Sequence, residues 1–397
     1  MSKPIYLYIT PFFPFHGRNW WGAYCLDAAK ALVKDGRYDV RVMATGSGED
    51  YEWDGLSVYR MKRRVLPCGV APFFVNWCNN RQFRRKLERM GVRPEEVAVC
   101  HANTLGCAHY SAYFKRLNPK AKTVVQIHSS YSLVLRSGRL GALPLHATLL
   151  YLYLRRICMG CDLLAFVSDM ARRTFGKMYV GAPEGEVRTV RSQLWLGRWL
   201  PELKIKETAV VYNGIDSELF FRKGRPTHEG FVIGCVANFQ PLKDHMTLLR
   251  ATNILKDKIK GLKVRLVGSG ETLGACKNYV RENALDGIVI FEPEIDHRDM
   301  PDFYRSLDLF VLPSRLEGFL CVCVESWACG TPAMFCEGTA LQELVPEDEK
   351  GTWLFRPMDA QDLADKIAEY RAHPKEQFFA RSLEIGCIWR EFLDEMP

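Results

Sequence analysis

The chain has 397 residues, of which 48% are hydrophobic and 25% are charged, with 30 glycines and 20 prolines. This length predicts two or three compact units, and the composition excludes a small single module, a collagen-like chain and a disordered one. The charge is uneven, because residues 1–206 carry 32 Lys and Arg against 15 Asp and Glu, whereas residues 207–397 carry 22 against 31. The basic first half favours an anionic partner, such as an acidic membrane surface, nucleic acid or a phosphorylated acceptor, or serves solubility alone.

No segment predicts export, membrane insertion or a metal site. No apolar stretch reaches the roughly 18 to 20 residues that span a bilayer, and the N-terminus, where Pro11 and Pro14 follow one short apolar run, does not match a signal peptide. The 14 cysteines are scattered among apolar neighbours, and Cys158-Met-Gly-Cys161 has no second CxxC or paired His at zinc-ligand spacing. We therefore expect a cytoplasmic protein with reduced thiols and no metal.

Short apolar and β-branched runs alternate with helical segments along the chain. Most of the runs are apolar throughout, which is typical of parallel strands that helices cover on both faces. The strands expected in the first half are 5–10, 39–45, 97–102, 123–129 and 163–168. Those expected in the second half are 209–213, 231–237, 263–268, 287–293, 307–314, 331–336 and 351–357. Two successive series of this kind predict an α/β protein with two doubly wound parallel sheets.

The change in charge sign near residue 206 and the polar stretch 221–230 place a hinge between about 200 and 230. The expected domains are 1–206 and 207–379, with a C-terminal helix at about 380–397 that completes the first domain. Because ligands of open parallel sheets bind beyond the carboxyl ends of the strands, we expect a ligand in a cleft between the domains. The segment 139–156 is most simply a core-facing helix, with a membrane-interface helix as the alternative. Residues 181–203 contain no motif.

The densest signal follows the apolar run 307–314. Residues 320–329 are apolar and end at Gly330, so they predict a buried helix whose N-terminus lies at the end of a strand, where a diphosphate can bind. Glu317 precedes this helix and Glu325 lies within it, roughly 10 to 12 Å away along a helix axis. The two carboxylates can accept hydrogen bonds from two parts of one extended ligand. Because the neighbours of Glu325 are apolar, its carboxylate needs a partner.

This spacing resembles the E-x7-E signature of retaining glycosyltransferases with the GT-B fold, and the surrounding chain resembles glycosyltransferase family 4, the group 1 glycosyl transferases. Three other segments agree in order: 211–216 resembles the family's Asn-Gly-x-Asp turn, 237–244 its phosphate loop and 265–270 its glycine loop. In the first half the similarity is looser and depends on 11–22, His128 and Ser168. The resemblance implies a GT-B protein, in which two Rossmann-like domains face a central cleft.

The resemblance also implies how the second domain binds a donor. Lys243 would hold the donor diphosphate as a point charge, and Glu325 would accept hydrogen bonds from the ribose of the nucleotide. Glu317, with the backbone N–H groups of Gly318 and Phe319, would hold the hydroxyls of the transferred sugar and the adjacent phosphate.

In the first domain, the resemblance places His128 near the donor sugar and the reacting centre, and Gly22 in a loop whose backbone approaches the phosphate. The expected catalytic residues are Glu317, His128 and Lys243. The expected donor-binding residues are Gly22, Asn238, Lys243, Gly268, Gly270, Glu317, Gly318, Phe319, Leu320 and Glu325.

Three positions depart from the family pattern. The family usually has Gly-Arg where this chain has Ala237-Asn238, so one cation for the leaving diphosphate is missing, and Arg18 is a candidate to replace it. Residues 17–22 lack the paired glycines of the family's first loop. The turn that contacts the base in the family is Phe291-Glu-Pro293 here, which leaves the identity of the base open.

The expected reaction is therefore a retaining transfer of a hexose or N-acetylhexosamine that needs no cofactor or metal. Lys243 and helix N-termini would stabilise the leaving diphosphate. No carboxylate in the motifs is placed as a nucleophile, so front-face attack is preferred. The expected partners are a nucleotide-sugar donor, a glycan or lipid-diphosphate-linked acceptor and an anionic membrane. This fits a peripheral enzyme at the inner face of the cytoplasmic membrane, in polysaccharide or lipopolysaccharide synthesis.

The sequence also allows other functions. A degenerate, non-catalytic scaffold and a nucleotide-sugar epimerase or phosphorylase on the same fold are the main alternatives. A dinucleotide-dependent oxidoreductase is disfavoured, because no strand is followed by G-x-G-x-x-G with an acid about 20 residues on. No nucleic-acid motif accompanies the basic half, so we expect no nucleic-acid partner.

Overall fold

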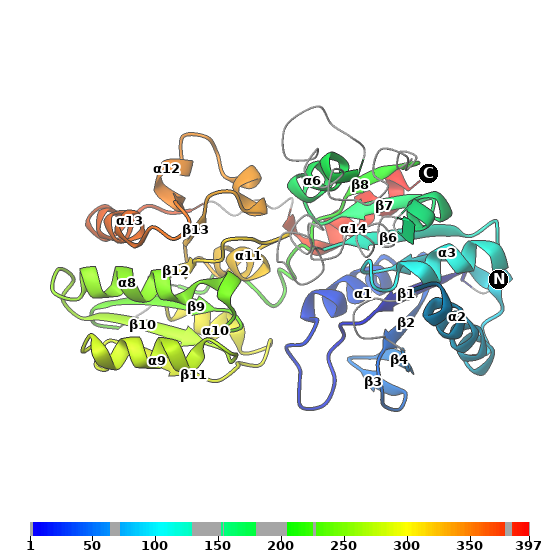
Figure 1. The fold of residues 1–397 in the computed structure, drawn as a ribbon, viewed down its shortest axis with the longest axis horizontal. Coiled ribbons are helices and arrows are strands. Elements are labelled where there is room, and N and C mark those ends of the chain that lie inside the picture. Colours follow the sequence, from blue (N-terminus) through cyan, green and yellow to red (C-terminus); the bar gives the residue numbers. More distant parts are fainter. Residues whose placement is uncertain are drawn as a thin grey trace. The chain divides into compact units, whose positions relative to one another are not determined.

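The computed structural model describes residues 3–63, 72–128, 152–153, 155–179, 205–224, 228–377 and 383–396. The chain forms two compact units, one of residues 1–212 with 388–397 and one of residues 213–387 (Figure 1). The sequence placed the boundaries at 206/207 and 379/380. Most of the helix expected at 139–156, namely residues 139–151, and the segment 181–203, in which we find no motif, lie outside the described residues.

The first unit contains an eight-stranded sheet with the order β3-β4-β2-β1-β5-β6-β7-β8. Neighbouring strands are parallel except for β3, which is antiparallel to β4. The strands are β1 (Ile5–Thr10), β2 (Asp39–Thr45), β3 (Tyr51–Trp53), β4 (Leu56–Met61), β5 (Val97–Ala102), β6 (Lys122–Ile127), β7 (Leu163–Phe166) and β8 (Thr208–Val210). The strand order reverses between β1 and β5, which is therefore the topological switch point of this sheet.

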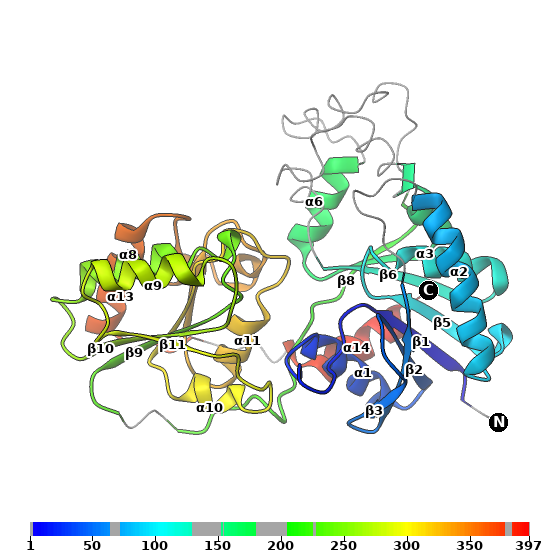
Figure 2. The same cartoon turned by 60° about the horizontal axis from the view of Figure 1, so that its bottom comes forward.

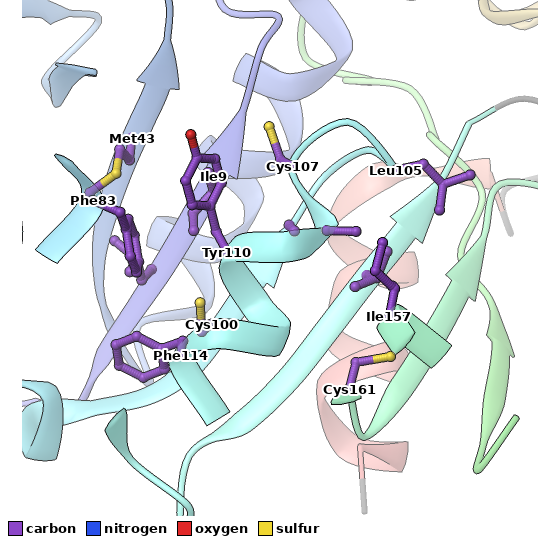
Figure 3. Packing of buried hydrophobic residues seen from close by; sticks show 14 of the residues in the cluster. Ile9, Met43, Phe83, Cys100, Leu105, Cys107, Tyr110, Phe114, Ile157 and Cys161 are labelled. Atoms are coloured by element: carbon purple, nitrogen blue, oxygen red, sulfur yellow. The ribbon is translucent and has the colours of Figure 1, made fainter. Parts of the chain in front are cut away.

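Helices α2 and α3 cover one part of the core of the first unit. The ring of Phe83 in α2 lies 5.1 Å from that of Tyr110 and 6.3 Å from that of Phe114, both in α3, and all three side chains are fully buried (Figure 3). The helices of this unit are α1 (Ala23–Asp35), α2 (Pro72–Arg89), η2 (Pro94–Glu96), α3 (Ala108–Leu117), α6 (Asp169–Tyr179) and α14 (Ile385–Glu395). Residues 155–160 are also helical.

The C-terminal helix α14 packs on the central strands of the first unit. The buried ring of Trp389 lies 6.5 Å from the ring of Tyr8 in β1 and 5.8 Å from the ring of His101 in β5. Arg37, just beyond α1, also forms an ion pair with Asp394 at 2.7 Å. These contacts hold the last residues of the chain in the first unit, although α14 begins in the second.

Two features of the first sheet differ from the strands that the sequence predicted. The hairpin of β3 and β4 was not predicted, because β4 is only partly buried and so lacks a continuous apolar run. Asp54 and Gly55 form its turn with φ angles of 50° and 78°, and this Asp-Gly pair is the signal that identifies a two-residue hairpin. The run 209–213 was assigned to the second series of strands, but β8 pairs in parallel with β7 and ends the first sheet.

The second unit contains a six-stranded, fully parallel sheet with the order β11-β10-β9-β12-β13-β14. The strands are β9 (Phe231–Val236), β10 (Leu262–Val267), β11 (Val289–Glu292), β12 (Leu309–Leu312), β13 (Ala333–Cys336) and β14 (Leu354–Phe355). Counted along the chain, this order is 3-2-1-4-5-6, the doubly wound order, and its switch point lies between β9 and β12. The predicted strand 351–357 is wrong in its first part, which belongs to the short helix α12 (Lys350–Trp353).

Figure 2 shows α8, α9 and α13 together on one face of the second sheet. The helices of this unit are η3 (Pro241–Lys243), α8 (His245–Leu255), α9 (Leu273–Glu282), α10 (Met300–Arg305), α11 (Cys321–Ala328), η4 (Ala340–Leu344), α12 and α13 (Ala360–Ala372). Within the described residues of both units, no helix has the length and apolar character that crossing a bilayer requires.

Candidate active site

Two loops follow the strands that flank the switch point of the second unit. One leads from β9 through η3 into α8, and the other leads from β12 into α11. Arg315 ties them together, because its backbone N–H donates to the carbonyl oxygen of Leu242 at 3.0 Å and its Nη2 donates to that of Pro241 at 2.8 Å. The loops therefore form one structure at the position where doubly wound sheets bind ligands.

Lys243 and Glu317 meet between these loops. The Nζ of Lys243, at the end of η3, forms an ion pair with Oε1 of Glu317, which lies four residues before α11. The side chains are 26% and 17% exposed, so the pair is partly screened from water but can still be reached by a ligand. A cation for a phosphate and a carboxylate for a hydroxyl are thus adjacent at the switch point.

Gly268 and Gly270 bring the loop after β10 against the loop after β9. Their φ angles are 136° and 149°, in a region that residues with a side chain rarely adopt. A Cβ on Gly270 would lie 2.5 Å from the carbonyl oxygen of Phe239. A Cβ on Gly268 would lie 2.4 Å from the carbonyl oxygen of Ala237. Asn238 is exposed between these two contacts. The structure thus brings three of the predicted donor-binding residues together.

A pair of buried rings packs at the loop 237–244, which resembles the family's phosphate loop. Phe239 is fully buried and stacks on His245 with ring centroids 4.0 Å apart and planes 10° apart. Burial, with a contribution from the charge of Lys243, lowers the pKa of His245 to about 4. The imidazole is therefore neutral at physiological pH, and Lys243 supplies the positive charge at this end of the loop.

The carboxylate of Glu325, which lies among apolar neighbours, has a hydrogen-bond partner in Tyr304. It lies in α11, is 9% exposed, and its Oε2 accepts a hydrogen bond of 2.6 Å from the hydroxyl of Tyr304 in α10. Burial raises the pKa of Tyr304 well above its usual value, so the hydroxyl stays protonated and donates. The sequence predicted that Glu325 needs a partner, and Tyr304 was missed because nothing in the sequence of α10 indicates it.

The residues between Glu317 and α11 are anchored in the core. Gly318, Phe319 and Leu320 are buried, and the carbonyl oxygen of Leu320 accepts from the backbone N–H groups of Cys323 and Val324 to begin the helix. Asn213 of the Asn-Gly-x-Asp turn donates from Nδ2 to the Sγ of Cys321 at 3.3 Å. The predicted helix after β12 is confirmed, and the positive end of its dipole lies at the switch point.

His128 follows β6 in the first unit and is bonded to Asn103, which follows β5. Its Nε2 lies 2.5 Å from Oδ1 of Asn103, and Nδ2 of Asn103 donates to the Sγ of Cys25 at 2.9 Å. Because the amide nitrogen faces Cys25, the amide oxygen accepts from His128. Burial lowers the pKa of His128 to about 3, so the ring is neutral. Asn103 was missed, although it follows a predicted strand.

Gly22 ends the long loop after β1 and directly precedes α1. Its φ is 74°, and a Cβ there would lie 2.5 Å from the carbonyl carbon of Phe12. A residue with a side chain would therefore displace the loop. Ser168 has a structural contact, since its Oγ accepts from the backbone N–H of Ala171 at 3.0 Å in the first turn of α6.

The predicted residues thus fall into two groups, one at the carboxyl ends of the strands in each unit. Arg315, which joins the two loops, was missed, although it lies two residues before Glu317 of the E-x7-E motif. Among the residues that the structure describes, no three His, Cys, Asp or Glu side chains are grouped closely enough to hold a metal ion.

Two family models match the chain. The model described as Glycosyltransferase Family 4 matches residues 22–191, and the model described as Glycosyl transferases group 1 matches residues 216–377. The two matches fall on the first and second units respectively, in agreement with the resemblance seen in the sequence motifs.

Curated relatives match part of the chain. A D-inositol 3-phosphate glycosyltransferase from Saccharomonospora viridis is 30% identical over 254 residues, which are 61% of this chain and 56% of the relative. A D-inositol 3-phosphate glycosyltransferase 1 from Catenulispora acidiphila is 38% identical over 212 residues, which are 47% of this chain and 49% of the relative. The chain thus spans about half the length of these relatives.

Solved structures match both units. A sucrose-phosphate synthase from Thermosynechococcus elongatus has a TM-score of 0.67 at 18% identity, covering 100% of this chain and 95% of that protein. HepE from Anabaena, in complex with UDP and glucose, also has a TM-score of 0.67 at 18% identity, with 98% of each chain covered. At these identities the likeness establishes the fold, and it confirms the expected GT-B class with two Rossmann-like domains.

Proposed function

We propose that this chain, which belongs to glycosyltransferase family 4 and the group 1 glycosyl transferases, transfers a sugar from a nucleotide-diphosphate donor with retention of its anomeric configuration. The observation that carries the proposal is the Lys243–Glu317 pair at the switch point of the second unit. A diphosphate needs a cation, and the hydroxyls of the attached sugar need an acceptor, and this pair offers both side by side.

Each group has a step in the proposed reaction. As the bond between the sugar and the nucleotide breaks, negative charge gathers on the leaving diphosphate, and Lys243 stabilises it together with the N-terminal end of α11. Glu317 accepts hydrogen bonds from the transferred sugar. Glu325, whose orientation is set by Tyr304, accepts from the ribose. Asn238 contributes no charge here, and Arg18 is our candidate for the missing cation.

His128 is the catalytic residue that we propose in the first unit. Its neutral ring is held through Nε2 by Asn103, which leaves Nδ1 as the nitrogen that can accept a hydrogen bond from the sugar or the acceptor. We propose front-face attack, in which an oxygen of the leaving phosphate takes the proton of the acceptor hydroxyl. NMR coupling constants of the product test this, because a product with inverted configuration contradicts a retaining reaction.

The acceptor is proposed to be a glycan or a lipid-diphosphate-linked glycan that receives a hexose or N-acetylhexosamine. The excess of Lys and Arg in the first half supports an anionic acceptor or membrane, since each basic group near an anionic leaflet is worth about 1 kcal/mol. The names of the inositol phosphate relatives also indicate a phosphorylated acceptor. We therefore propose a peripheral enzyme at the inner face of the cytoplasmic membrane, in polysaccharide or lipopolysaccharide synthesis.

A nucleotide screen tests the donor site. The purified protein is assayed by thermal shift and by sugar transfer or hydrolysis with UDP-, GDP-, ADP- and dTDP-sugars, beginning with UDP because HepE was solved with it. Stabilisation by one nucleotide class, lost in Lys243→Ala and Glu325→Ala, supports the proposal. Lys258→Ala and Glu282→Ala are matched controls, since both residues are exposed in the same unit and lie outside the site. No response to any nucleotide points instead to the degenerate scaffold.

A further inference from the structure

The first unit contains a groove whose lining includes neither His128 nor Gly22. It has a volume of about 630 Å³ and runs between α2, α3 and the helical residues 155–160. A volume of a few hundred Å³ is typical of sites that bind small organic ligands. The groove is therefore large enough for a ligand.

Each helix turns one face toward the groove. Helix α3 contributes four residues spaced three, four and seven positions apart, which share one side of a helix, together with Lys115. The four are His109, Ala112, Tyr113 and Arg116. The other lining residues are Asn76, Trp77, Asn80, Arg81 and Arg84 from α2, and Tyr153, Arg156, Ile157, Met159 and Gly160 from the helical segment that includes residues 155–160. The helices meet closely at the floor, where a Cβ on Gly160 would lie 3.0 Å from the Cβ of Ala112.

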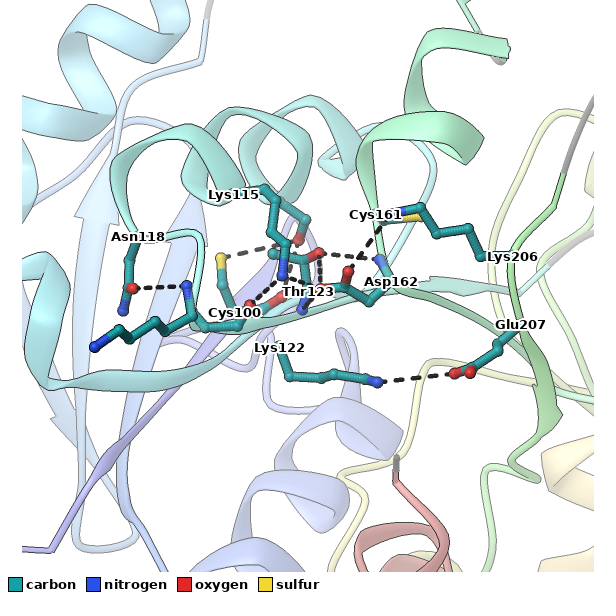
Figure 4. Close-up of polar contacts among 12 residues, drawn as sticks. Cys100, Lys115, Asn118, Lys122, Thr123, Cys161, Asp162, Lys206 and Glu207 are labelled. Carbon is teal, nitrogen blue, oxygen red and sulfur yellow. Dashed lines mark hydrogen bonds and ion pairs between the residues drawn. The ribbon is translucent and has the colours of Figure 1, made fainter.

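The described lining of the groove carries positive charge and no carboxylate. Its cationic residues are Arg81, Arg84, Lys115, Arg116, Arg156 and Lys206. Part of this charge is compensated from outside, because Asp162 lies 2.7 Å from Lys115 and 3.6 Å from Lys206 (Figure 4). Arg84 also has an exposed partner, Glu88, at 3.4 Å.

Arg81 and Arg116 are the uncompensated cations of the groove. Both are exposed, and within the described parts of the chain neither has a carboxylate partner. They approach the groove from different helices, α2 and α3. Arg binds phosphate oxygens through two parallel hydrogen bonds, so guanidinium groups from two helices of one groove suit a phosphate.

The lining of the groove also includes aromatic side chains. Trp77 of α2 is 59% exposed, and Tyr113 of α3 lines the same groove. His109 also lines this space, but it is only 6% exposed and both of its ring nitrogens are buried, so its ring forms part of the wall. The exposed aromatic ring of Trp77 therefore offers the surface on which the organic part of a ligand can pack.

We propose that this groove is a second ligand site, which binds a phosphate ester. Arg81 and Arg116 hold the phosphate, while the organic part lies along Tyr113 and Trp77. The site is separate from the proposed donor site, which depends on Lys243 in the other unit. The same chemistry can come from the headgroup of a membrane phospholipid or from a free phosphate ester.

Calorimetry with a short-chain, water-soluble phosphatidic acid tests the site directly. We expect binding, and about tenfold weaker binding by the Arg81→Gln/Arg116→Gln double variant. The matched control is Arg85→Gln/Arg89→Gln, which removes the same charge from exposed positions of α2 outside the groove. The control is expected to bind within about twofold of the unchanged protein. Equal losses in both variants indicate diffuse attraction and overturn the proposal, as does absence of binding.

Flotation with phosphatidylcholine vesicles, with and without phosphatidic acid, separates the two sources of ligand. Binding of the soluble ester without flotation indicates a free phosphate ester, and flotation that the groove variant alone abolishes indicates a lipid headgroup. Trp77→Ser is expected to weaken binding of the short-chain ester but not of inorganic pyrophosphate. Nucleotide-sugar binding, measured on every variant, is expected to be unchanged, so failure at this groove is distinguishable from failure of the donor site.

Discussion

The Oδ1 of Asn103 lies 2.5 Å from the Nε2 of His128, and this contact sets the tautomer of the histidine. Since the amide nitrogen of Asn103 donates to Cys25, the oxygen is the acceptor and Nε2 carries the proton. With a pKa lowered to about 3 by burial, the ring stays neutral and presents Nδ1 as an acceptor. Asn103 is thus a positioning residue for His128.

Replacing Asn103 by leucine is predicted to slow transfer without changing donor affinity. The variant leaves Nε2 without its acceptor, and a lost buried hydrogen bond costs about 1 to 3 kcal/mol, so we expect kcat to fall about tenfold or more with little change in KM. Nitrogen NMR of the imidazole should show a mixture of tautomers. Cys25→Ala removes the other partner of Asn103 and is expected to have a smaller effect. If Asn103→Leu keeps a single tautomer and full kcat, Asn103 does not position His128.

The ion pair of Lys243 and Glu317 predicts effects of opposite sign on nucleotide binding. Glu317→Gln removes the carboxylate beside the proposed diphosphate position, so we expect nucleotide diphosphate to bind as tightly or more tightly while transfer becomes about a hundredfold slower. Lys243→Met removes the cation, and binding is expected to weaken about tenfold. Calorimetry and single-turnover rates measure the two effects separately. Weaker nucleotide binding in both variants would contradict the proposed division of roles.

The sequence predicted the strands best where helices cover both faces of a sheet. There the runs are mainly apolar, and the ranges 5–10 and 97–102 match β1 and β5 residue for residue. The range 39–45 also matches β2, although Asp39 and Arg41 interrupt its apolar residues. The half-buried β4 has no continuous apolar run, so it was not predicted. The sequence of the short β8 does not indicate which sheet the strand joins. Strand pairing depends on the three-dimensional path of the chain, so β8 was assigned to the wrong series.

The site residues show the same limit. Motif spacing identified Lys243 and Glu317, which lie 74 positions apart in the chain and form an ion pair in the structure. It did not identify Tyr304 or Asn103, because their contacts with Glu325 and His128 arise only when separate elements pack together. A burial argument predicted that Glu325 needs a partner, but it could not say which one.

Alanine at Gly270 is predicted to disrupt the phosphate loop. The added Cβ would lie 2.5 Å from the carbonyl oxygen of Phe239, and the φ of 149° is unfavourable for alanine. We expect a loss of about 2 kcal/mol in unfolding free energy and weaker nucleotide binding. Gly274→Ala is the control, because a Cβ at that position in α9 meets no atom within 4 Å. Denaturant unfolding and calorimetry measure both effects, and equal behaviour of the two variants would show that the loop contact is dispensable.

Three histidines predict that the first unit loses stability as the pH falls below about 6.5. They are His101, His109 and His128, and burial lowers the pKa of each to about 3. Between that value and the unfolded pKa of about 6.5, the unfolded chain binds protons that the folded chain does not, so acidification favours unfolding. From pH 6.5 to pH 5, each histidine removes up to about 2 kcal/mol, before ordinary carboxylates begin to titrate.

Denaturant titrations at several pH values between 7.5 and 5 measure this loss. His109→Leu removes one of the three titrating groups, and we expect the pH dependence of its unfolding free energy over this range to fall by about a third. His373→Leu is the matched control substitution, because it removes an exposed imidazole from the second unit. A slope that is the same in all three proteins would mean that His109 is protonated in the folded state, which its burial beside the charge of Arg63 opposes.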